Sequence, residues 1–496
     1  MDNVLTATIA IAYLVLLTFV AVRSRTFITK PSRPCVQPAS DRRRETKEES
    51  PRHGFEEFSL ARRSLPVALV FASLAATYIG PGFSLGFAGR GFKSGFLFLG
   101  IGLAYALQNI LVGLLVAPRL RGLSGCHTLG EAIGQKYGKR CHVLAGAISV
   151  GLCAGFAAVM AKAGGEVVHD IFGLPPALSV IVVVALTALF PTIGGLRANV
   201  VADSFQFITF SLLLPLMLLL VLSIHLKGGP AAFAVQASAA TVEGLSSTST
   251  LEIIGLVAAF LLGETLIPPY ANRALACRTT NVSRNSFILA GLFSMFWFMV
   301  MISLGITARS IIPADTGEDV VLLNLVKSVM PTFGRAILFV ALVSVVTSSL
   351  DSLLNAGAVA FTQDVVKSFV KLSDDLALKV GRAATLAIAA VAAVGAVAVP
   401  SIIGGLLICY TVWAPSILPT LIIGLWIKNP RPLAGTLSMG VGTVAAVTFW
   451  IILWLIFKFV YPANVEIPPL VIIPALAAAL LAYAAGHWIE KHKSGA

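Results

Sequence analysis

Charged residues are scarce in this chain. Of its 496 residues, only 12% are Asp, Glu, Lys or Arg, whereas soluble globular proteins contain about 25%. A soluble enzyme of this length is therefore excluded. The chain also has no Walker A sequence and no room for a soluble catalytic domain, so we expect no enzymatic activity.

Residues that bind transition metals or form disulfides are also few. The six cysteines contain no CxxC pair and the seven histidines are scattered, so no transition-metal site is expected. Four cysteines are expected on or near the cytoplasmic face and two within helices: Cys35, Cys126, Cys141 and Cys277, then Cys153 and Cys409. None lies on an outside loop, so no disulfide framework is implied.

Hydrophobic residues make up 57% of the chain and indicate an all-α polytopic membrane protein. Thirteen apolar stretches are long enough to cross a hydrocarbon core of about 30 Å. They are expected at about 4–22, 65–87, 94–117, 141–163, 176–195, 204–226, 251–270, 286–308, 335–365, 383–400, 402–427, 434–460 and 468–488.

The basic residues predict how these spans are oriented. Lys and Arg outnumber Asp and Glu by 36 to 23, an excess that in a soluble chain would suggest nucleic acid. With the N-terminus outside and the spans alternating, 28 basic residues fall on the cytoplasmic side and 8 on the other. This split follows the positive-inside rule. We therefore expect a multi-pass protein of the cell membrane, a bacterial inner membrane, with the C-terminus inside and no nucleic-acid partner.

Two connections stand out by composition. Residues 23–64 are polar and basic and predict a solvated cytoplasmic loop that is held against anionic membrane lipid. Residues 227–250 are rich in Gly, Ala, Ser and Thr and are expected to form a flexible outside loop. Neither connection indicates an obligatory protein partner.

Two apolar stretches carry helix-breaking residues at corresponding positions. The second contains Gly80-Pro81-Gly82, and the seventh, five helices later, contains Pro268-Pro269. Proline removes a backbone donor, and non-helical backbone at membrane depth is tolerated only inside protein or beside a water-filled cavity. The matched pair favours an inverted-repeat transporter with its binding site at the breaks. The alternative is that these prolines only kink their helices.

The ninth stretch carries a polar face. Its residues Ser348, Asp351, Ser352 and Asn355 recur at the spacing of one helix face. Their oxygen atoms, with carbonyls freed by an unwound neighbouring helix, would suit a small cation such as Na⁺. Alternatively, the hydroxyls bond to their own helix or to a neighbour.

Ionisable residues within spans are functional candidates by default. Asp203 is either a helix-end charge paired with Arg197 or a second cation ligand. Glu264, beside the second break, is expected to bind a substrate amine, to carry a proton, or to accept from a backbone donor freed by Pro268. Lys162 and Glu166 are expected to form a surface pair.

Several motifs between about residues 65 and 428 together resemble the sodium:solute symporter family, including its sodium/proline and sodium/glucose transporters. They are Phe71 to Gly80 followed by Gly89, Gly91 and Gly95; His127 to Ala132 with Tyr137-Gly138; Gly194-Gly195-Leu196 with Asp203 and Gln206; and Ser348 to Ser352.

The resemblance implies a LeuT-like fold of two inverted five-helix repeats. The implied organisation is a leading helix at 1–22, the basic loop at 23–64, the repeats at 65–226 and 251–427, and two C-terminal helices with a short tail at 428–496. The implied function is Na⁺-coupled symport of a small organic solute by alternating access. A proton-coupled symporter and a solute sensor with the transporter fold are the alternatives.

The resemblance also implies roles for individual residues. The sodium ligands carried over are the carbonyls of Ala76, Ile79 and Val345 and the hydroxyls of Ser348 and Ser349. Asp203, Asp351 and Glu264 are candidates for a second cation or for coupling. Gly80, Gly82, Ser84, Gln108 and Tyr270 are the substrate candidates, and they favour an amino acid such as proline, a monocarboxylate or a quaternary amine over a sugar.

Overall fold

A computed structural model of the chain describes residues 6, 8–13, 15–17, 19, 53–225, 229–460 and 469–493. Over these residues the regular structure is helical, with one isolated β-bridge between Leu65 and Cys277. Much of the predicted leading helix at 4–22, and residues 23–52 of the predicted basic loop, lie outside the described residues.

Nine helices in the described part of the chain are long and apolar enough to cross a membrane, and two bent pairs raise the number to eleven. The nine are α5 to α6 (Leu97–Gly122), α8 (Lys139–Phe172), the second part of α9 (Gly194–Ile224), α13 (Thr280–Ala308), α15 to α16 (Thr332–Phe369), α17 with η6 (Asp374–Ala398), α18 (Ile402–Trp426), α19 (Pro432–Ile456) and η7 with α20 (Pro469–Lys493).

Both predicted breaks are present. Helix α3 (Val67–Tyr78) is separated from the segment Gly82–Ser94, which contains η2 (Gly82–Gly86) and α4 (Phe87–Ser94), by a bend of 61°. Helix α11 (Thr250–Leu262) is separated from α12 (Pro268–Ala276) by five residues, among which Leu266 has a φ of 47°. Pro268 opens α12 at a position where its missing N–H removes no helical bond.

Helix α9 (Pro176–His225) is also interrupted. Gly195 adopts φ 64° and ψ −163°, a conformation that suits glycine, and its Cα lies against the backbone of Phe58. The interruption accounts for the two apolar stretches predicted at 176–195 and 204–226.

Two predicted loops contain helices instead. Residues 227–250, expected to be flexible, include α10 (Gly229–Ser247), which bends by 105° into α11. The end of the predicted basic loop forms α2 (His53–Leu60) and η1 (Ala61–Arg63). There Phe55 and Phe58, three residues apart, are buried against Val359 and Ala377, so a short apolar stripe orders this part of the chain.

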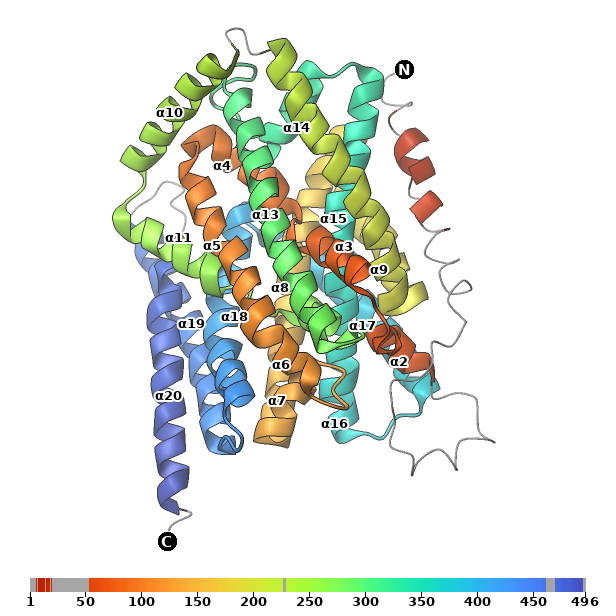
Figure 1. Cartoon of the computed structure of the whole chain (residues 1–496), viewed down its shortest axis with the longest axis vertical. Helices are drawn as coiled ribbons and strands as arrows, with labels where there is room; N and C mark the ends of the chain where they lie inside the picture. The colour runs from red at the N-terminus through yellow and green to blue at the C-terminus, as the bar shows by residue number, and fades with distance from the viewer. Residues whose placement is uncertain are drawn as a thin grey trace.

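Helix α15 (Thr332–Ala360) is the centre of the molecule. It is almost entirely buried and packs against α8, α9, α3, α12 and α17. Helices α19 (Pro432–Val460) and α20 (Ile472–Lys493) lie together at one side (Figure 1) and are far less buried. Helices α10 and α14 (Val321–Val329) lie at one end of the bundle, and α7 (Leu129–Tyr137) and α16 (Lys367–Phe369) lie at the other.

Three segments are π-helical. They are η2, η3 (Val112–Val116) and η5 (Phe361–Val366). Segments η3 and η5 each lie between two α-helices, and η2 lies between the first break and α4. Such wider turns are frequent at functional sites. Here η2 adjoins the first break, and η5 lies at the end of the polar central helix.

Candidate functional site

The end of α3 and the middle of α15 bring together four of the five predicted sodium ligands. The Ser348 hydroxyl donates to the carbonyls of Ala76 and Val345, both at 3.1 Å. The Ser349 hydroxyl lies 3.3 Å from the carbonyl of Thr77 and 3.4 Å from that of Val345. All these residues are buried.

The spacing of these oxygens suits a small cation. When metal–oxygen distances are about 2.4 Å, neighbouring octahedral ligands lie about 3.4 Å apart. The oxygen separations here are 3.1 to 3.4 Å. The remaining predicted ligand, the carbonyl of Ile79, accepts a hydrogen bond from Ser84 Oγ at 2.8 Å.

Glycine at the first break makes this close approach possible. A Cβ on Gly80 would collide with Ser349 Oγ, and a Cβ on Gly82 would collide with Leu406. Gly80 therefore lies beside Ser349, one of the cation candidates.

A buried arginine joins the two broken helices to α9 and α15. Arg273, on α12, is 1% exposed. Its guanidinium donates to Asp203 Oδ2 at 2.7 Å, to Ser73 Oγ at 2.6 Å and to Ser352 Oγ at 2.6 Å. Ser73 also donates to Asp203 Oδ2 at 2.5 Å. This cluster of four side chains is called the Arg273 network below.

The structure contradicts one prediction and one of the alternatives for these charges. The predicted stretches at 251–270 and 286–308 leave Arg273 in the cytoplasmic connection between them, but α12 carries it into the protein core. Asp203 pairs with Arg273 and not with Arg197, whose guanidinium binds Glu57 Oε1 at 2.8 Å. The sequence held one clue to Arg273, because an ionisable residue within a span, such as Asp203, usually pairs with another charged group.

Asp351 lies beside the Arg273 network rather than against the sodium candidates. Its Oδ1 accepts from Ser352 at 3.2 Å, and its backbone carbonyl accepts from Asn199 at 3.2 Å. Asp351 Oδ2 and the side-chain amide of Asn355 have no hydrogen-bond partner among the described residues. The predicted polar face therefore divides between the sodium candidates and this network.

Glu264 lies in the second break and is 6% exposed. Its Oε1 accepts from the Tyr270 hydroxyl at 2.7 Å and its Oε2 accepts from the Tyr410 hydroxyl at 2.9 Å. The Tyr105 hydroxyl lies 3.5 Å from that of Tyr270. Tyr105 and Tyr410 were not among the predicted site residues, because their helices show no sequence irregularity at those positions.

Two other substrate candidates are already engaged. Ser84 donates to the carbonyl of Ile79 and accepts from Trp297 Nε1 at 3.1 Å, so it supports the break. Gln108 Nε2 donates to Thr265 Oγ1 at 2.6 Å, while its Oε1 has no partner among the described residues. Gln108 thus lies next to Glu264 with one acceptor free.

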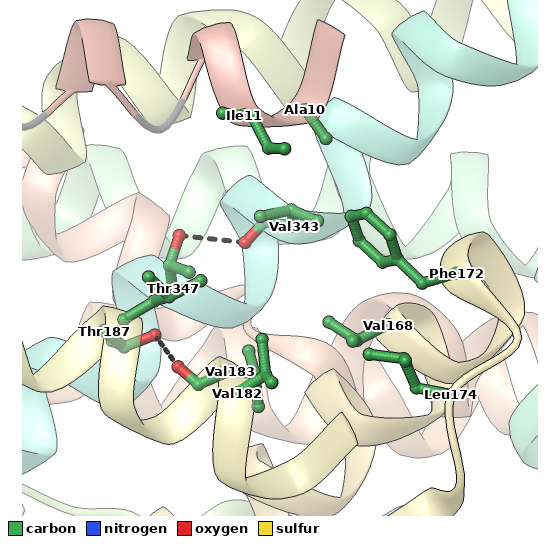
Figure 2. A pocket seen from close by; sticks show the side chains of 11 residues that line it. Ala10, Ile11, Val168, Phe172, Leu174, Val182, Val183, Thr187, Val343 and Thr347 are labelled. Carbon is green, nitrogen blue, oxygen red and sulfur yellow. Dashed lines mark hydrogen bonds between the residues drawn. The ribbon is translucent and has the colours of Figure 1, made fainter. Parts of the chain in front are cut away.

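An apolar cavity of about 230 Å³ lies elsewhere, between the leading helix and α8, α9 and α15 (Figure 2). Ala10, Ile11 and Phe172 line it, and the Thr187 and Thr347 hydroxyls turn away to carbonyls of their own helices at 2.7 and 2.8 Å. Its apolar lining separates it from the polar groups at the breaks.

At the opposite end from α10, Asp364 on η5 holds α7 and α8. Its carboxylate accepts from Thr128 and lies 2.9 Å from His142 Nε2. Glu131 of α7 accepts from Gln363 at 2.6 Å. Burial lowers the pKa of His127, which precedes α7, and so favours the neutral form of the ring.

One further predicted ion pair lies within α8. Lys162 and Glu166 form the predicted ion pair at 3.6 Å. In the described ranges, five cysteines are free thiols and no group of His, Cys, Asp or Glu is arranged to hold a metal ion.

Comparison with known proteins identifies related sequences. A model of the sodium:solute symporter family matches residues 58–438. The sodium/glucose cotransporter of Vibrio parahaemolyticus is 25% identical over 440 residues, which cover 79% of this chain and 78% of that protein. The uncharacterized symporter YidK of Escherichia coli is 23% identical over 82% of this chain and 75% of its own length.

Solved structures show the fold. A Na⁺-coupled sialic acid symporter in a substrate-bound outward-open state matches 99% of this chain and 98% of its own with a TM-score of 0.77 at 14% identity. Mhp1, a nucleobase-cation-symport-1 family transporter, matches 88% of this chain and 95% of its own with a TM-score of 0.52 at 14% identity. This chain shares the fold of these membrane transporters.

Proposed function

Because the chain belongs to the sodium:solute symporter family, we propose that it carries a small organic solute across the membrane together with Na⁺ by alternating access. The family match spans both broken helices and α15, so it includes every candidate site residue. Na⁺ is the co-transported ion, and the protein is a multi-pass transporter rather than an enzyme.

The observation that carries the proposal is the joining of α3 to α15 by Ser348 and Ser349. Their hydroxyls and the carbonyls of Ala76 and Val345 offer closely spaced oxygens from two helices. A cation bound there would hold the two helices together. Ile79 would complete this set once its carbonyl exchanges the bond from Ser84. The helices at 65–226 and 251–427 would form two inverted repeats, with one helix before them and two after.

The Arg273 network supplies a route for coupling. Arg273 follows the second break, while Ser352 lies one turn beyond Ser348 on the central helix. A movement of α12 on solute binding would therefore shift Ser352 and, one turn away on the same helix, the sodium candidate Ser348. By linkage, Na⁺ and solute then raise each other's affinity by the same factor.

The driving force is the inward sodium gradient together with the membrane potential, which contributes about 2.3 kcal/mol per charge per 100 mV.

The Arg273 network also bears on the number of sodium ions. Arg273 pairs with Asp203 Oδ2, while Asp203 Oδ1 has no hydrogen-bond partner among the described residues. The guanidinium charge opposes a second cation beside this carboxylate, which favours a single Na⁺ at the Ser348 position.

For the solute we propose an amino acid such as proline, a monocarboxylate or a quaternary amine. Beyond the first break the chain offers Gly82, Phe83 and Ser84, and Ser84 is engaged with Trp297. A sugar requires many hydrogen-bonding side chains, which this segment does not provide. We propose the bacterial inner membrane, in contact with membrane lipid, as the location.

Proton coupling is the second candidate, and Glu264 is the observation that favours it. This carboxyl is buried at the second break and hydrogen-bonded only by tyrosines in the described part of the chain. Asp351, with one unpartnered oxygen, is the other group that could carry a proton.

Uptake into vesicles separates the two candidates. The full-length protein is reconstituted, and entry of labelled proline, lactate, choline and glucose is measured under an imposed Na⁺ gradient, with and without a pH gradient. Uptake that requires Na⁺ is the expected result. Uptake that follows the pH gradient and is indifferent to Na⁺ would establish the proton-coupled alternative.

A further inference from the structure

Glu264 is a carboxylate without a cation. Its two oxygens accept from Tyr270 and Tyr410, and none of the described Lys, Arg or His side chains forms an ion pair with it. Asp203 is also buried, but it is bound to Arg273. A carboxylate has room for about four donors, and two hydroxyls leave part of that capacity free.

Aromatic rings surround this carboxylate. Tyr78, Tyr105, Tyr270 and Tyr410 come from α3, α5, α12 and α18, and each is at most 1% exposed. The rings of Tyr78 and Tyr270 meet edge to face with centroids 4.2 Å apart, and the Tyr78 and Tyr105 centroids are 6.0 Å apart. These four tyrosines with Glu264 are called the tyrosine cage below.

The cage contains unused polar atoms. The Tyr78 hydroxyl has no hydrogen-bond partner among the described residues, although it is buried. The same holds for Oε1 of Gln108, whose Nε2 bonds to Thr265, the residue after Glu264. Buried polar groups without a partner are uncommon in proteins. The Tyr78 hydroxyl can accept or donate a hydrogen bond and the Gln108 amide oxygen accepts one, so both can bind a ligand that donates hydrogen bonds.

We infer that the transported solute carries a positively charged nitrogen and that this nitrogen binds in the tyrosine cage against Glu264. The inference rests on the proposed function and selects among its solutes. A buried carboxylate is stabilised by an opposite charge, and an ammonium group is attracted to the faces of tyrosine rings. A primary or secondary ammonium would donate to Glu264, Tyr78 and Gln108, whereas a quaternary one would rest on the rings.

The negative charge of Glu264 disfavours monocarboxylates and sugars as solutes. A monocarboxylate without a positive nitrogen would place a second negative charge beside Glu264, which like-charge repulsion opposes. A neutral sugar would leave the buried carboxylate uncompensated. An amino acid remains acceptable because its ammonium group can face Glu264 while its carboxylate lies elsewhere.

Matched probes test the charge directly. The purified full-length protein in lipid nanodiscs is titrated, with Na⁺ present, with choline against its uncharged isostere 3,3-dimethylbutan-1-ol, and with proline against tetrahydrofuran-2-carboxylate. Thermal stabilisation reports binding. We expect at least one of the two probes with a positive nitrogen to bind at least about tenfold more tightly than its isostere without one. Equal binding within both pairs would overturn the inference.

Variants assign the preference to Glu264. Glu264→Gln should reduce to about one the ratio of the affinity for the probe with a positive nitrogen to that for its isostere, while stabilisation by Na⁺ alone is retained. Glu264→Asp should keep the preference, and so should the control Glu166→Gln, which alters a partly exposed ion pair outside the cage. If Glu264→Gln does not fold, Tyr410→Phe keeps the carboxylate and should weaken binding without removing the preference. A preference that survives Glu264→Gln would refute the inference.

The uptake assay separates this inference from the proposed function. Na⁺-driven uptake restricted to neutral or anionic probes would overturn the inference and leave sodium symport intact. Binding of charged probes through Glu264 without Na⁺-driven uptake of any probe would support the cage and refute symport. Uptake of an uncharged probe that follows the pH gradient and is lost in Glu264→Gln would make Glu264 a proton carrier and overturn the inference.

Discussion

At the scale of single residues, Arg273 is a buried charge whose stability depends on its partners. Removing a guanidinium from water costs several kcal/mol, even after local relaxation. Three side chains and the carbonyl of Pro269 accept its hydrogen bonds, and Asp203 supplies the opposite charge. Its replacement would leave Asp203 buried without compensation.

A double-mutant cycle measures this dependence. Arg273→Gln alone should destabilise the protein by about 3–5 kcal/mol, because it leaves the Asp203 carboxylate unpaired. Asp203→Asn alone should also be destabilising, and the double variant should be less so than the two effects added together. The melting temperature of the purified protein is the measurement. Additive effects would show that the two charges do not depend on each other.

Ser348 and Ser349 carry the second prediction at this scale. Hydrogen-bond or ligand contacts to a charged group contribute about 1.5–3 kcal/mol. Ser348→Ala and Ser349→Ala should therefore each raise the Na⁺ concentration needed for half-maximal uptake about tenfold or more.

The matched control for these serines is Ser294→Ala. The Ser294 hydroxyl is buried and bonds only to the carbonyl of Ala290 on its own helix, at 2.8 Å. This variant should leave the Na⁺ requirement unchanged. An unaltered Na⁺ dependence in both Ser348→Ala and Ser349→Ala would mean that the ion binds elsewhere.

Sequence reasoning identified part of this site. The oxygen-rich spacing around Ser348 and the matched breaks were visible because local pattern encodes them. Arg273, Tyr105 and Tyr410 were missed because their roles depend on contacts with residues far away in the chain. Arg273 contacts Asp203, 70 positions away, and Tyr410 contacts Glu264, 146 positions away.

At the scale of helical elements, the first break depends on the absence of a side chain at Gly80. Gly80 lies where α3 has ended and where Ser349 of α15 approaches the chain. The close approach of the two helices therefore requires hydrogen at this Cα. A larger residue would separate α3 from α15 at the proposed cation site.

Gly80→Ala should accordingly impair Na⁺ coupling. Overpacking of this kind costs about 1–3 kcal/mol, and here it would also displace the Ser349 hydroxyl. We expect a loss of Na⁺-induced thermal stabilisation.

Gly100→Ala on α5 is the control for this substitution, because its added methyl meets open space. It should behave as the unsubstituted protein. If Gly80→Ala retains full stabilisation by Na⁺, the contact with Ser349 is not part of the ion site.

Element boundaries were predictable where apolar length and proline decide them, and less so elsewhere. The breaks and the division of α9 follow from Pro and Gly positions. Helix α10 was missed because its Gly, Ala, Ser and Thr content is typical of loops, and α2 was missed because its short apolar stripe follows a long polar segment.

At the scale of the whole molecule, the balance of charge predicts orientation. The connection between α18 and α19, with Lys428 exposed, is expected inside the cell, and the connection after α13, with Asp315 exposed, is expected outside.

Thiol labelling of intact cells tests this orientation. In a background without the native cysteines, Asp315→Cys should react with a membrane-impermeant maleimide, and Lys428→Cys should react only after permeabilisation. Fluorescence of the labelled band is the readout. The reverse pattern would invert the predicted topology.

The π-helical segment η5 has a consequence for comparing sequences. A π-helical turn contains one residue more than an α-helical turn, so η5 acts as a single-residue insertion that turns the following part of the helix by about 100°. Asp364 lies within η5 and reaches Thr128 and His142. A homologue without the extra residue would present a different side chain to α7, and an alignment through this region needs a one-residue gap at Phe361–Val366.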